Sequence, residues 1–363
     1  MNSPTNDAMP RVAFFSDSLP ERNGAGAYYF DLLKQLSAYP FSTAIFQPRR
    51  QVRLNWLSIP MPGDPSQRLI TPNLFRIRRG LKRLKPQIVI SITPGPFGIL
   101  GYLYAKRNNL KFISAFHTDF EQLVKIYWNP LTRSFANYYL SSINKLLCRY
   151  SEYTLINNSN LIPQVERLGA KKYKIMGTPL PEFYFNKPLN PPPEAFEQIC
   201  FAGRLAAEKN IHLIIKAAEH FKQIKFVIVG DGPLNRPLKD SARKLKNVRF
   251  TGWVNRNKLV EIIDCSNCLL LPSKLETFGS IAYEAMARGR PTIVSENSGI
   301  NQWDSLRENI IILKHEENLI QSIQSLIDIS PEERASFGAR SREAAIQFNK
   351  MTLGHWTDLL SQL

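Results

Sequence analysis

Short apolar runs alternate with helix-like stretches along the whole chain. The runs occupy positions 12–16, 43–47, 88–92, 112–116, 153–157 and 174–176 in the first half, and 199–202, 226–229, 248–250, 268–272, 292–294 and 310–313 in the second. Stretches between them, such as 27–37 and 161–168, have the apolar spacing of amphipathic helices. Strands that alternate with helices predict parallel sheets covered by helices on both faces. We therefore expect a doubly wound α/β protein.

A proline-rich segment divides the two series of runs. Pro179, Pro181 and Pro188 precede three consecutive prolines at 191–193. Proline at this density ends helices and is excluded from central strands. The sequence therefore predicts two Rossmann-like domains, at 1–178 and 198–344, joined by a linker at 179–197. Ligands of such sheets bind beyond the carboxyl ends of the strands, so the chemistry is expected in the loops that follow strands.

The positive charge is concentrated in the first half. The chain of 363 residues has 47 Lys and Arg against 30 Asp and Glu, a net charge of +17. Up to residue 190 there are 25 basic and 10 acidic residues, whereas the remainder has 22 and 20. This asymmetry indicates that the first domain faces an anionic surface, either nucleic acid or acidic phospholipid.

The sequence shows no membrane-spanning or secretory segment and no cysteine pattern of a disulfide or metal site. No apolar run approaches the ~20 residues of a spanning helix, and the first ten residues lack the apolar region of a signal peptide. Four cysteines are too few for a disulfide scaffold. Cys265 and Cys268 have C-x2-C spacing without a second pair, so no metal site is predicted. We expect a cytoplasmic protein.

Polar and glycine-rich loops follow several of the predicted strands. Five motifs stand in such loops: Asn23-Gly24, Phe116-His117-Thr118-Asp119, Gly203-Arg204 with Glu208-Lys209, Val229-Gly230-Asp231-Gly232-Pro233, and Glu276-Thr277-Phe278-Gly279 with Glu284. Glycine turns at the N-termini of helices can bind a phosphate, and arginine and lysine side chains can bind a diphosphate. In this order and loop context the motifs resemble the group 1 (family 4) glycosyltransferases, from residue 12 to the final helix.

The resemblance implies the GT-B fold, in which two Rossmann-like domains face a central cleft. It also implies that a final helix at about 345–363 packs back on the first domain and that 198–344 bind a nucleotide-sugar. Roles follow for the matching positions. The catalytic set would be His117, Arg204, Lys209 and Glu276, and the donor-binding set would be Gly24, Gly203, Gly230, Trp253, Thr277, Phe278, Gly279 and Glu284.

Within this resemblance, Arg204 and Lys209 would bind the donor diphosphate and stabilise the leaving group. Glu284 would hold the ribose, Glu276 the transferred sugar and His117 the reacting centre. The chain lacks the D-x-D motif that holds a divalent ion in other glycosyltransferases. The resemblance therefore implies transfer with retention of configuration, without metal or other cofactor.

The acceptor is the least constrained partner. Residues 76–85 combine basic residues, among them Arg76, Arg79 and Arg83, with apolar ones at helical spacing, and Trp128 ends a second apolar stretch beside a lysine. This pattern is typical of a solvated surface helix or of one that docks on an anionic leaflet. We expect a lipid or lipid-linked glycan acceptor, with the enzyme peripheral on the inner face of the plasma membrane.

Three alternatives stay open. The first is transfer to a soluble acceptor or a polysaccharide. A basic nucleic-acid-binding protein would need stacking aromatic residues among the basic ones or a known module, and neither is present, so nucleic acid is not expected as a partner. A sugar-nucleotide epimerase would need an acid/base set that the sequence does not show.

Overall fold

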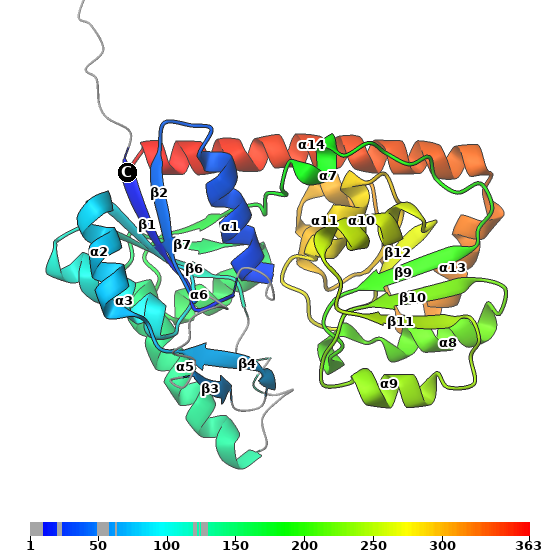
Figure 1. The fold of residues 1–363 in the computed structure, drawn as a ribbon, viewed down its shortest axis with the longest axis horizontal. Helices are drawn as coiled ribbons and strands as arrows, with labels where there is room; N and C mark the ends of the chain where they lie inside the picture. The colour runs from blue at the N-terminus through cyan, green and yellow to red at the C-terminus, as the bar shows by residue number, and fades with distance from the viewer. Residues whose placement is uncertain are drawn as a thin grey trace, which may run out of the picture. The chain divides into compact units, whose positions relative to one another are not determined.

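The structure is a computed structural model that describes residues 10–19, 24–48, 58–61, 64–118, 122, 124 and 130–363. The chain divides into two compact units (Figure 1). The first comprises Met1–Pro179 together with Met351–Leu363, and the second comprises Leu180–Lys350. Among the described residues, no helix is both long and apolar enough to cross a membrane.

The first unit is built on a parallel six-stranded sheet in the order β2-β1-β5-β6-β7-β8. All six strands lie where the sequence predicts them. In chain order its elements are β1 (Arg11–Phe15), α1 (Gly24–Leu36), β2 (Ser42–Phe46), β3 (Ser58–Met61), β4 (Asp64–Ile70), α2 (Leu74–Leu84), β5 (Ile88–Ser91), α3 (Pro96–Arg107), β6 (Lys111–Phe116), α5 (Pro130–Tyr150), β7 (Tyr153–Ile156), α6 (Ile162–Arg167) and β8 (Tyr173–Ile175).

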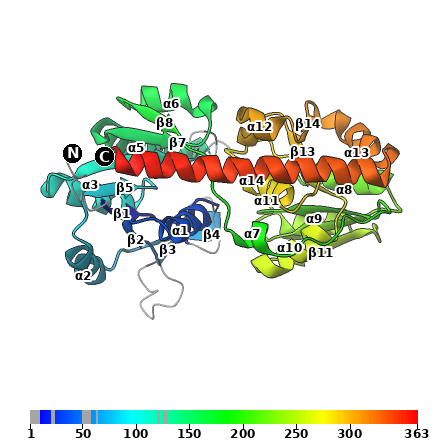
Figure 2. The same ribbon diagram turned by 90° about the horizontal axis from the view of Figure 1, so that it is seen from above.

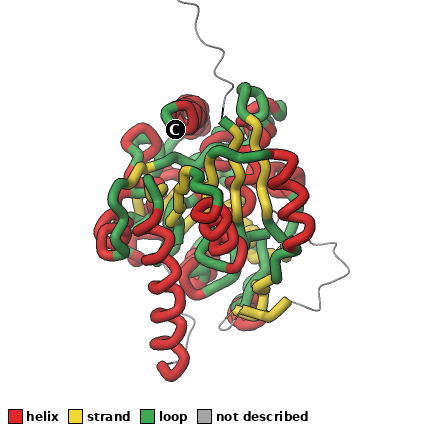
Figure 3. The backbone as a smooth tube through the Cα atoms, turned by 90° about the vertical axis from the view of Figure 1, so that its left-hand side faces the viewer, coloured by secondary structure: helices red, strands yellow, loops and turns green. Residues whose placement is uncertain are grey.

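Strand β1 shows why both faces of this sheet are covered. Val12 and Phe14 belong to a core beneath α1, whereas Ala13 and Phe15 belong to a core beneath α2, α3 and α5. Side chains alternate between the faces of a strand, so an uninterrupted apolar run requires helices on both sides. Figure 3, which views the molecule end-on, shows strands lying between helices, and the first turns of α5 extend beyond the rest of this unit.

A short antiparallel hairpin, β3 paired with β4, was not predicted. It forms a separate two-stranded sheet between β2 and α2 in chain order. Its sequence contains Pro60 and Pro65 and no apolar alternation. A hairpin of this composition carries no strand signal that could be read from the sequence.

The second unit repeats the design with a parallel sheet in the order β11-β10-β9-β12-β13-β14. Its six strands also lie at the predicted positions. The elements are α7 (Phe183–Asn186), β9 (Gln198–Ala202), α8 (His212–His220), β10 (Lys225–Val229), α9 (Asn235–Ser241), β11 (Val248–Gly252), α10 (Arg256–Asp264), β12 (Cys268–Leu271), α11 (Ser280–Ala287), β13 (Thr292–Ser295), α12 (Asp304–Arg307), β14 (Ile311–Leu313), α13 (Leu319–Asp328) and α14 (Pro331–Ser361).

The expected linker at 179–197 is almost entirely part of the second unit, which starts at Leu180. Buried arginines hold it there, because Arg288 donates to the carbonyls of 184, 187 and 188, and Arg290 to those of 190 and 191. Arg334 and Arg342, both on α14, bind the carbonyls of 194 and 185. Proline removes backbone donors but leaves these carbonyls as acceptors, so the segment is anchored rather than loose.

Helix α14 belongs to both units. It is one uninterrupted helix (Figure 2). Its residues up to Lys350 belong to the second unit, and those from Met351 onward belong to the first. In the first unit, Trp356, Leu359 and Leu360 are buried in the core beneath α1. The terminal helix thus completes the core of the first unit.

Candidate functional site

Strand order places a switch point in the second unit between β9 and β12. From β9 the chain builds outward to β10 and β11, then returns to the other side of β9 for β12, β13 and β14. Loops that leave neighbouring strands in opposite directions open a crevice at the carboxyl ends, and ligands bind there. The loop after β9 carries Arg204 and Lys209, and the loop after β12 carries Glu276. The loops that carry Arg204, Lys209 and Glu276 therefore meet at the switch point.

Lys209 and Glu276 are in direct contact. Nζ of Lys209 lies 2.5 Å from Oε2 of Glu276, and both side chains are largely shielded, with 18% and 15% of their surface exposed. Their backbones are fixed by local structure: Lys209 ends a 3-10 turn, and Glu276 forms a bridge with Ser298. A charge pair at a strand end, away from bulk water, is suited to binding a polar, charged ligand.

Glycines let the loops after β9 and β10 pack backbone against backbone. Gly230 has a φ of +127°, and a Cβ placed on it would lie 1.9 Å from the carbonyl oxygen of Gly203. Gly279, with φ +101°, caps the start of α11. Only glycine meets both the positive φ and the close approach at Gly230. These predicted positions therefore have a steric reason for their residue type.

Glu284 lies on α11, where Tyr184 holds its carboxylate. The hydroxyl of Tyr184 donates to Oε2 of Glu284 at 2.7 Å, and Tyr184 is 1% exposed. Arg288 in turn binds the Tyr184 carbonyl, so the carboxylate is oriented by a chain of buried contacts. Tyr184 was not predicted as a site residue, because its only local signal is a tyrosine inside a proline-rich segment.

The remaining predicted residues of this unit differ in which of their atoms could contact a ligand. The Phe278 ring is 3% exposed and stacks on Phe348 at 6.0 Å between centroids, so its side chain serves the core. Only the backbone of Phe278 could therefore contact a ligand. Thr277 precedes it in the same loop. Trp253 follows β11 and is 59% exposed, which leaves its indole available for stacking.

In the first unit, His117 directly follows β6 and contacts Tyr29 of α1. The Tyr29 hydroxyl lies 2.5 Å from Nε2 of His117, and Tyr28 packs its ring edge-on against the imidazole at 5.7 Å. Burial lowers the pKa of His117 to about 4, because charging the ring here means losing water. The imidazole is therefore neutral at physiological pH. Tyr29 was not predicted as a site residue, because its helical spacing indicates a core residue.

The switch point of the first unit, between β1 and β5, is closed by its own carboxylate. Asp17 accepts hydrogen bonds from the Thr93 hydroxyl at 2.6 Å and from the amide of Phe97, at the start of α3, at 2.9 Å. Burial raises the pKa of Asp17, and these hydrogen bonds act in the opposite direction. Since the amides at the start of α3 already donate to this carboxyl group, the helix start is not a free phosphate site.

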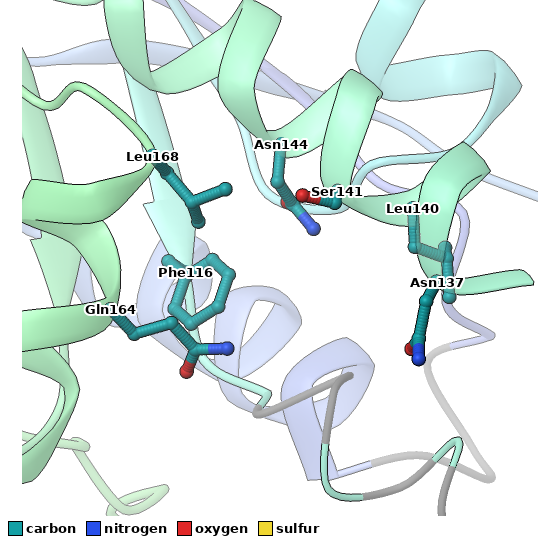
Figure 4. A pocket seen from close by; sticks show the side chains of 7 residues that line it. All are labelled: Phe116, Asn137, Leu140, Ser141, Asn144, Gln164 and Leu168. Carbon is teal, nitrogen blue, oxygen red and sulfur yellow. The ribbon is translucent and has the colours of Figure 1, made fainter. Parts of the chain in front are cut away.

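Two small cavities lie outside these clusters. One of about 10 Å³ lies in the first unit beneath Phe116, with Asn144 and Ser141 of α5 and Gln164 of α6 around it (Figure 4). This volume suits about one water molecule. The other, of about 110 Å³, lies at the ends of β12, β13 and β14 and is lined by polar residues that include Lys274 and Glu316.

Comparison with known families matches both units. The family described as Glycosyl transferases group 1 matches residues 185–344, and Glycosyltransferase Family 4 matches residues 22–174. The chain belongs to the group 1 (family 4) glycosyltransferases. The sequence-based expectation of this family is thereby confirmed, and the protein is a glycosyltransferase with the GT-B fold.

Individual relatives are distant from this glycosyltransferase. An alpha-monoglucosyldiacylglycerol synthase of Acholeplasma laidlawii is 24% identical over 86% of this chain and 87% of its own. Sucrose-phosphate synthase from Thermosynechococcus elongatus has a TM-score of 0.75 at 17% identity, over 97% and 98% of the two chains. HepE of Anabaena, solved in complex with UDP-glucose, has a TM-score of 0.69 at 14% identity, over 97% and 99%. Alignments with three other curated relatives span 29 to 46% of those proteins.

The glycosyltransferase also carries a basic helix on its first unit. On α2, Ile77 and Leu81 are buried, whereas Leu74 and Phe75 are 62% and 81% exposed. The helical spacing of Leu74, Ile77, Leu81 and Leu84 predicts one apolar face for this helix. Leu74 is nevertheless exposed, because it lies in the first turn of the helix, before the buried pair. Exposed basic residues share the helix: Arg76, Arg78, Arg79, Lys82 and Arg83.

Some predictions fall outside the described residues. Trp128, Asn23 and Asp119 are among them, as is most of the second apolar stretch. Gly24 is the first residue of α1. Of the C-x2-C cysteines, Cys268 is buried in β12 and Cys265 is exposed at the end of α10. Among the described residues, no group of three His, Cys, Asp or Glu side chains could hold a metal ion.

Proposed function

We propose that this glycosyltransferase moves a hexosyl group from a nucleotide-sugar to a hydroxyl of a membrane lipid or lipid-linked glycan, with retention of configuration and without a metal ion. The observation that carries the proposal is the paired Lys209 and Glu276 at the β9/β12 switch point, with Arg204 in the same loop as Lys209. These residues offer what a sugar diphosphate requires: cations for the phosphates and a carboxylate for sugar hydroxyls.

The transfer needs stabilisation of the departing nucleoside diphosphate, whose negative charge grows as the glycosidic bond breaks. Arg204 and Lys209 supply positive charge, in place of the divalent ion that other glycosyltransferases hold on a D-x-D motif. Glu284, oriented by Tyr184, suits the paired hydroxyls of the ribose. The Lys209–Glu276 contact keeps both side chains in place before the donor arrives, which lowers the ordering cost of binding.

Thermal unfolding of the full chain with UDP-glucose, GDP-mannose or ADP-glucose, in excess EDTA, tests the donor site. A ligand at ~100 times its Kd adds about 2.7 kcal/mol to the free energy of unfolding. We expect a stabilising shift with one nucleotide class, lost in Arg204→Ala and kept in the control Lys216→Ala, an exposed position on α8. UDP-glucose is the first choice because HepE, a fold neighbour, binds it.

Three results would contradict this assignment. A shift that appears only after Mg²⁺ or Mn²⁺ is restored would rule out the metal-independent part. No shift with any donor, or an equal shift in Arg204→Ala, would rule out the site. Retention is checked by proton NMR of the glycosylated product, whose anomeric coupling must match that of the donor sugar.

The membrane part of the proposal rests on α2. Its exposed Leu74 and Phe75 adjoin five basic residues with no acidic residue in the helix. Each basic residue near an anionic leaflet contributes about 1 kcal/mol, and apolar side chains insert into the interface. The similarity to a monoglucosyldiacylglycerol synthase supports a lipid acceptor.

Co-sedimentation with vesicles of phosphatidylglycerol and phosphatidylcholine tests this surface. We expect binding that weakens with salt and is largely lost in Arg79→Glu/Arg83→Glu, two exposed residues one turn apart on α2. The control Lys222→Glu/Lys239→Glu makes the same charge change at exposed positions of the second unit. Equal loss in both variants would show that only net charge matters, and no binding by the parent would favour a soluble acceptor.

A further inference from the structure

Tyr29 and His117 form an isolated hydrogen-bonded pair in the first unit. Tyr29 is 0% exposed and lies in the second turn of α1, and its hydroxyl is 2.5 Å from Nε2 of His117. Phe14, Tyr28 and Trp356 pack around the Tyr29 ring at 4.4 to 6.0 Å between centroids. The apolar packing leaves the hydroxyl a single described partner, the imidazole.

The neutral imidazole has two tautomers, and this contact distinguishes them. If Nε2 carried the hydrogen, it would donate to the Tyr29 oxygen, and the phenol hydrogen would have no described acceptor. If Nδ1 carries it, the phenol donates to the Nε2 lone pair. The first arrangement leaves two buried groups unpaired, the phenol O–H and the Nδ1 lone pair, whereas the second leaves only the Nδ1–H. Unpaired buried polar groups are costly, so the second arrangement is favoured. Among the described residues Nδ1 itself has no hydrogen-bond partner.

Other observations agree with a neutral ring and a protonated phenol. Burial lowers the pKa of His117 to about 4 and raises that of Tyr29 well above its ordinary value. Within the described residues no carboxylate is hydrogen-bonded to either group to favour the charged imidazolium. The proton between Tyr29 and Nε2 therefore remains on the phenol oxygen.

We propose that Tyr29 is a positioning residue that holds His117 in the Nδ1–H tautomer, so that His117 donates a hydrogen bond to an oxygen of the substrate. This use of the ring rests on the proposed function, whereas the tautomer does not. With the Nε2 lone pair accepting the phenol hydrogen and Nδ1 protonated, the ring has no free lone pair with which to take a proton from the substrate. His117 is thus a donor of a hydrogen bond and not a general base.

The tautomer is tested on the resting full-length chain by long-range proton–nitrogen NMR with ¹⁵N-labelled histidine. The chain has five histidines, and His117→Gln identifies the signals of His117. We expect the parent protein to show a protonated Nδ1 and an unprotonated Nε2. A protonated Nε2 in the parent protein overturns the proposal, and this measurement needs no variant of Tyr29.

Two matched variants test the part played by Tyr29. Tyr29→Phe keeps the ring and removes the hydroxyl that faces His117, and we expect its tautomer to change or become mixed. The control Tyr28→Phe removes a neighbouring buried hydroxyl on α1, which donates to the Gly177 carbonyl and accepts from Trp356, and touches neither imidazole nitrogen. An unchanged His117 spectrum in Tyr29→Phe overturns the proposal.

Kinetics with the donor identified by the binding assay complete the test. We expect Tyr29→Phe to lower kcat about tenfold with little change in the KM of the donor, and Tyr28→Phe to leave kcat within twofold of the parent. An unchanged kcat in Tyr29→Phe, with an altered tautomer, overturns the catalytic part. Failure of the proposed function appears separately, as the absence of donor binding and transfer in the parent protein.

Discussion

Loss of the Arg288 side chain should affect both the stability of the second unit and its binding of the donor. Its guanidinium makes five hydrogen bonds: two to the Asp264 carboxylate at 2.8 and 2.7 Å, and one each to the carbonyls of Tyr184, Lys187 and Pro188. All five of its N–H groups are therefore used. Both side chains of the ion pair are essentially buried, at 0% and 2% exposure. The perturbation is Arg288→Met, which keeps most of the volume and removes every donor.

The expected loss in the free energy of unfolding follows from the polar groups that Arg288 leaves without a partner. Asp264 keeps a buried carboxylate without its cation, and three carbonyls lose a partner. Breaking one side of a buried ion pair costs about 3–5 kcal/mol. At a urea dependence of ~2 kcal/mol per molar, the midpoint of unfolding should fall by roughly 2 M. Because Tyr184 loses the anchor of its carbonyl and no longer holds Glu284 firmly, donor affinity should also weaken.

Urea unfolding followed by circular dichroism measures the first effect, and calorimetric titration with the donor measures the second. The control is Arg307→Met on α12, an exposed arginine, for which a change within about 0.5 kcal/mol is expected. The double variant Arg288→Met/Asp264→Leu should recover part of the loss, since the buried charge is gone while the carbonyls stay unpaired. A loss below 1 kcal/mol in Arg288→Met, similar to the control, would refute the reasoning.

Four further outcomes are expected. Lys209→Ala should raise the Kd of the nucleotide-sugar at least tenfold in a calorimetric titration, because a cation beside the diphosphate is lost. Gly230→Ala should lower the unfolding temperature markedly, since its Cβ would lie 1.9 Å from a carbonyl oxygen. Tyr184→Phe should weaken donor binding two- to tenfold with little change in kcat, because the Glu284 carboxylate loses one hydrogen bond. The pKa of His117 is about 4 in the folded state against 6.5 when unfolded, so the unfolded chain takes up this proton first as the pH falls. Stability should therefore decline between pH 6.5 and 4 by up to about 3 kcal/mol, and calorimetric scans of His117→Gln should lack this part of the slope.

The fold was readable from the sequence because its central strands are buried on both faces. The edge strands β2, β8 and β11 are only partly buried. A run such as that of β10, Lys225–Val229, is apolar throughout its buried part and is bounded by turn signals, and the central strands β1, β5, β9 and β12 have the same character. The hairpin β3–β4 lacks it. Composition also marked a division of the chain near Pro179, but not which unit holds the prolines, since that depends on arginines about 100 residues away.

The candidate site was predictable where the chemistry lies in consecutive residues. Arg204, Lys209 and Glu276 follow strands whose positions were predicted, and parallel strands bring their carboxyl ends to one edge of a sheet. Tyr29 and Tyr184 were not predictable, because each acts through a partner 88 or 100 residues away in sequence. In the sequence, a tyrosine on an apolar helix face indicates core packing. The hydrogen-bond partner of its hydroxyl is known only once the fold is known.

The division of α14 between the units has a consequence for the order in which they mature on the ribosome. The first unit is translated early, but Trp356, Leu359 and Leu360, which cover the α1 side of its sheet, follow the whole of Leu180–Lys350. At ~5–20 residues per second, synthesis of the intervening segment takes roughly 10 to 35 s. During this time the apolar core residues that Trp356 packs against stay uncovered and accessible to chaperones or to another nascent chain. The unit translated first is therefore the last to close.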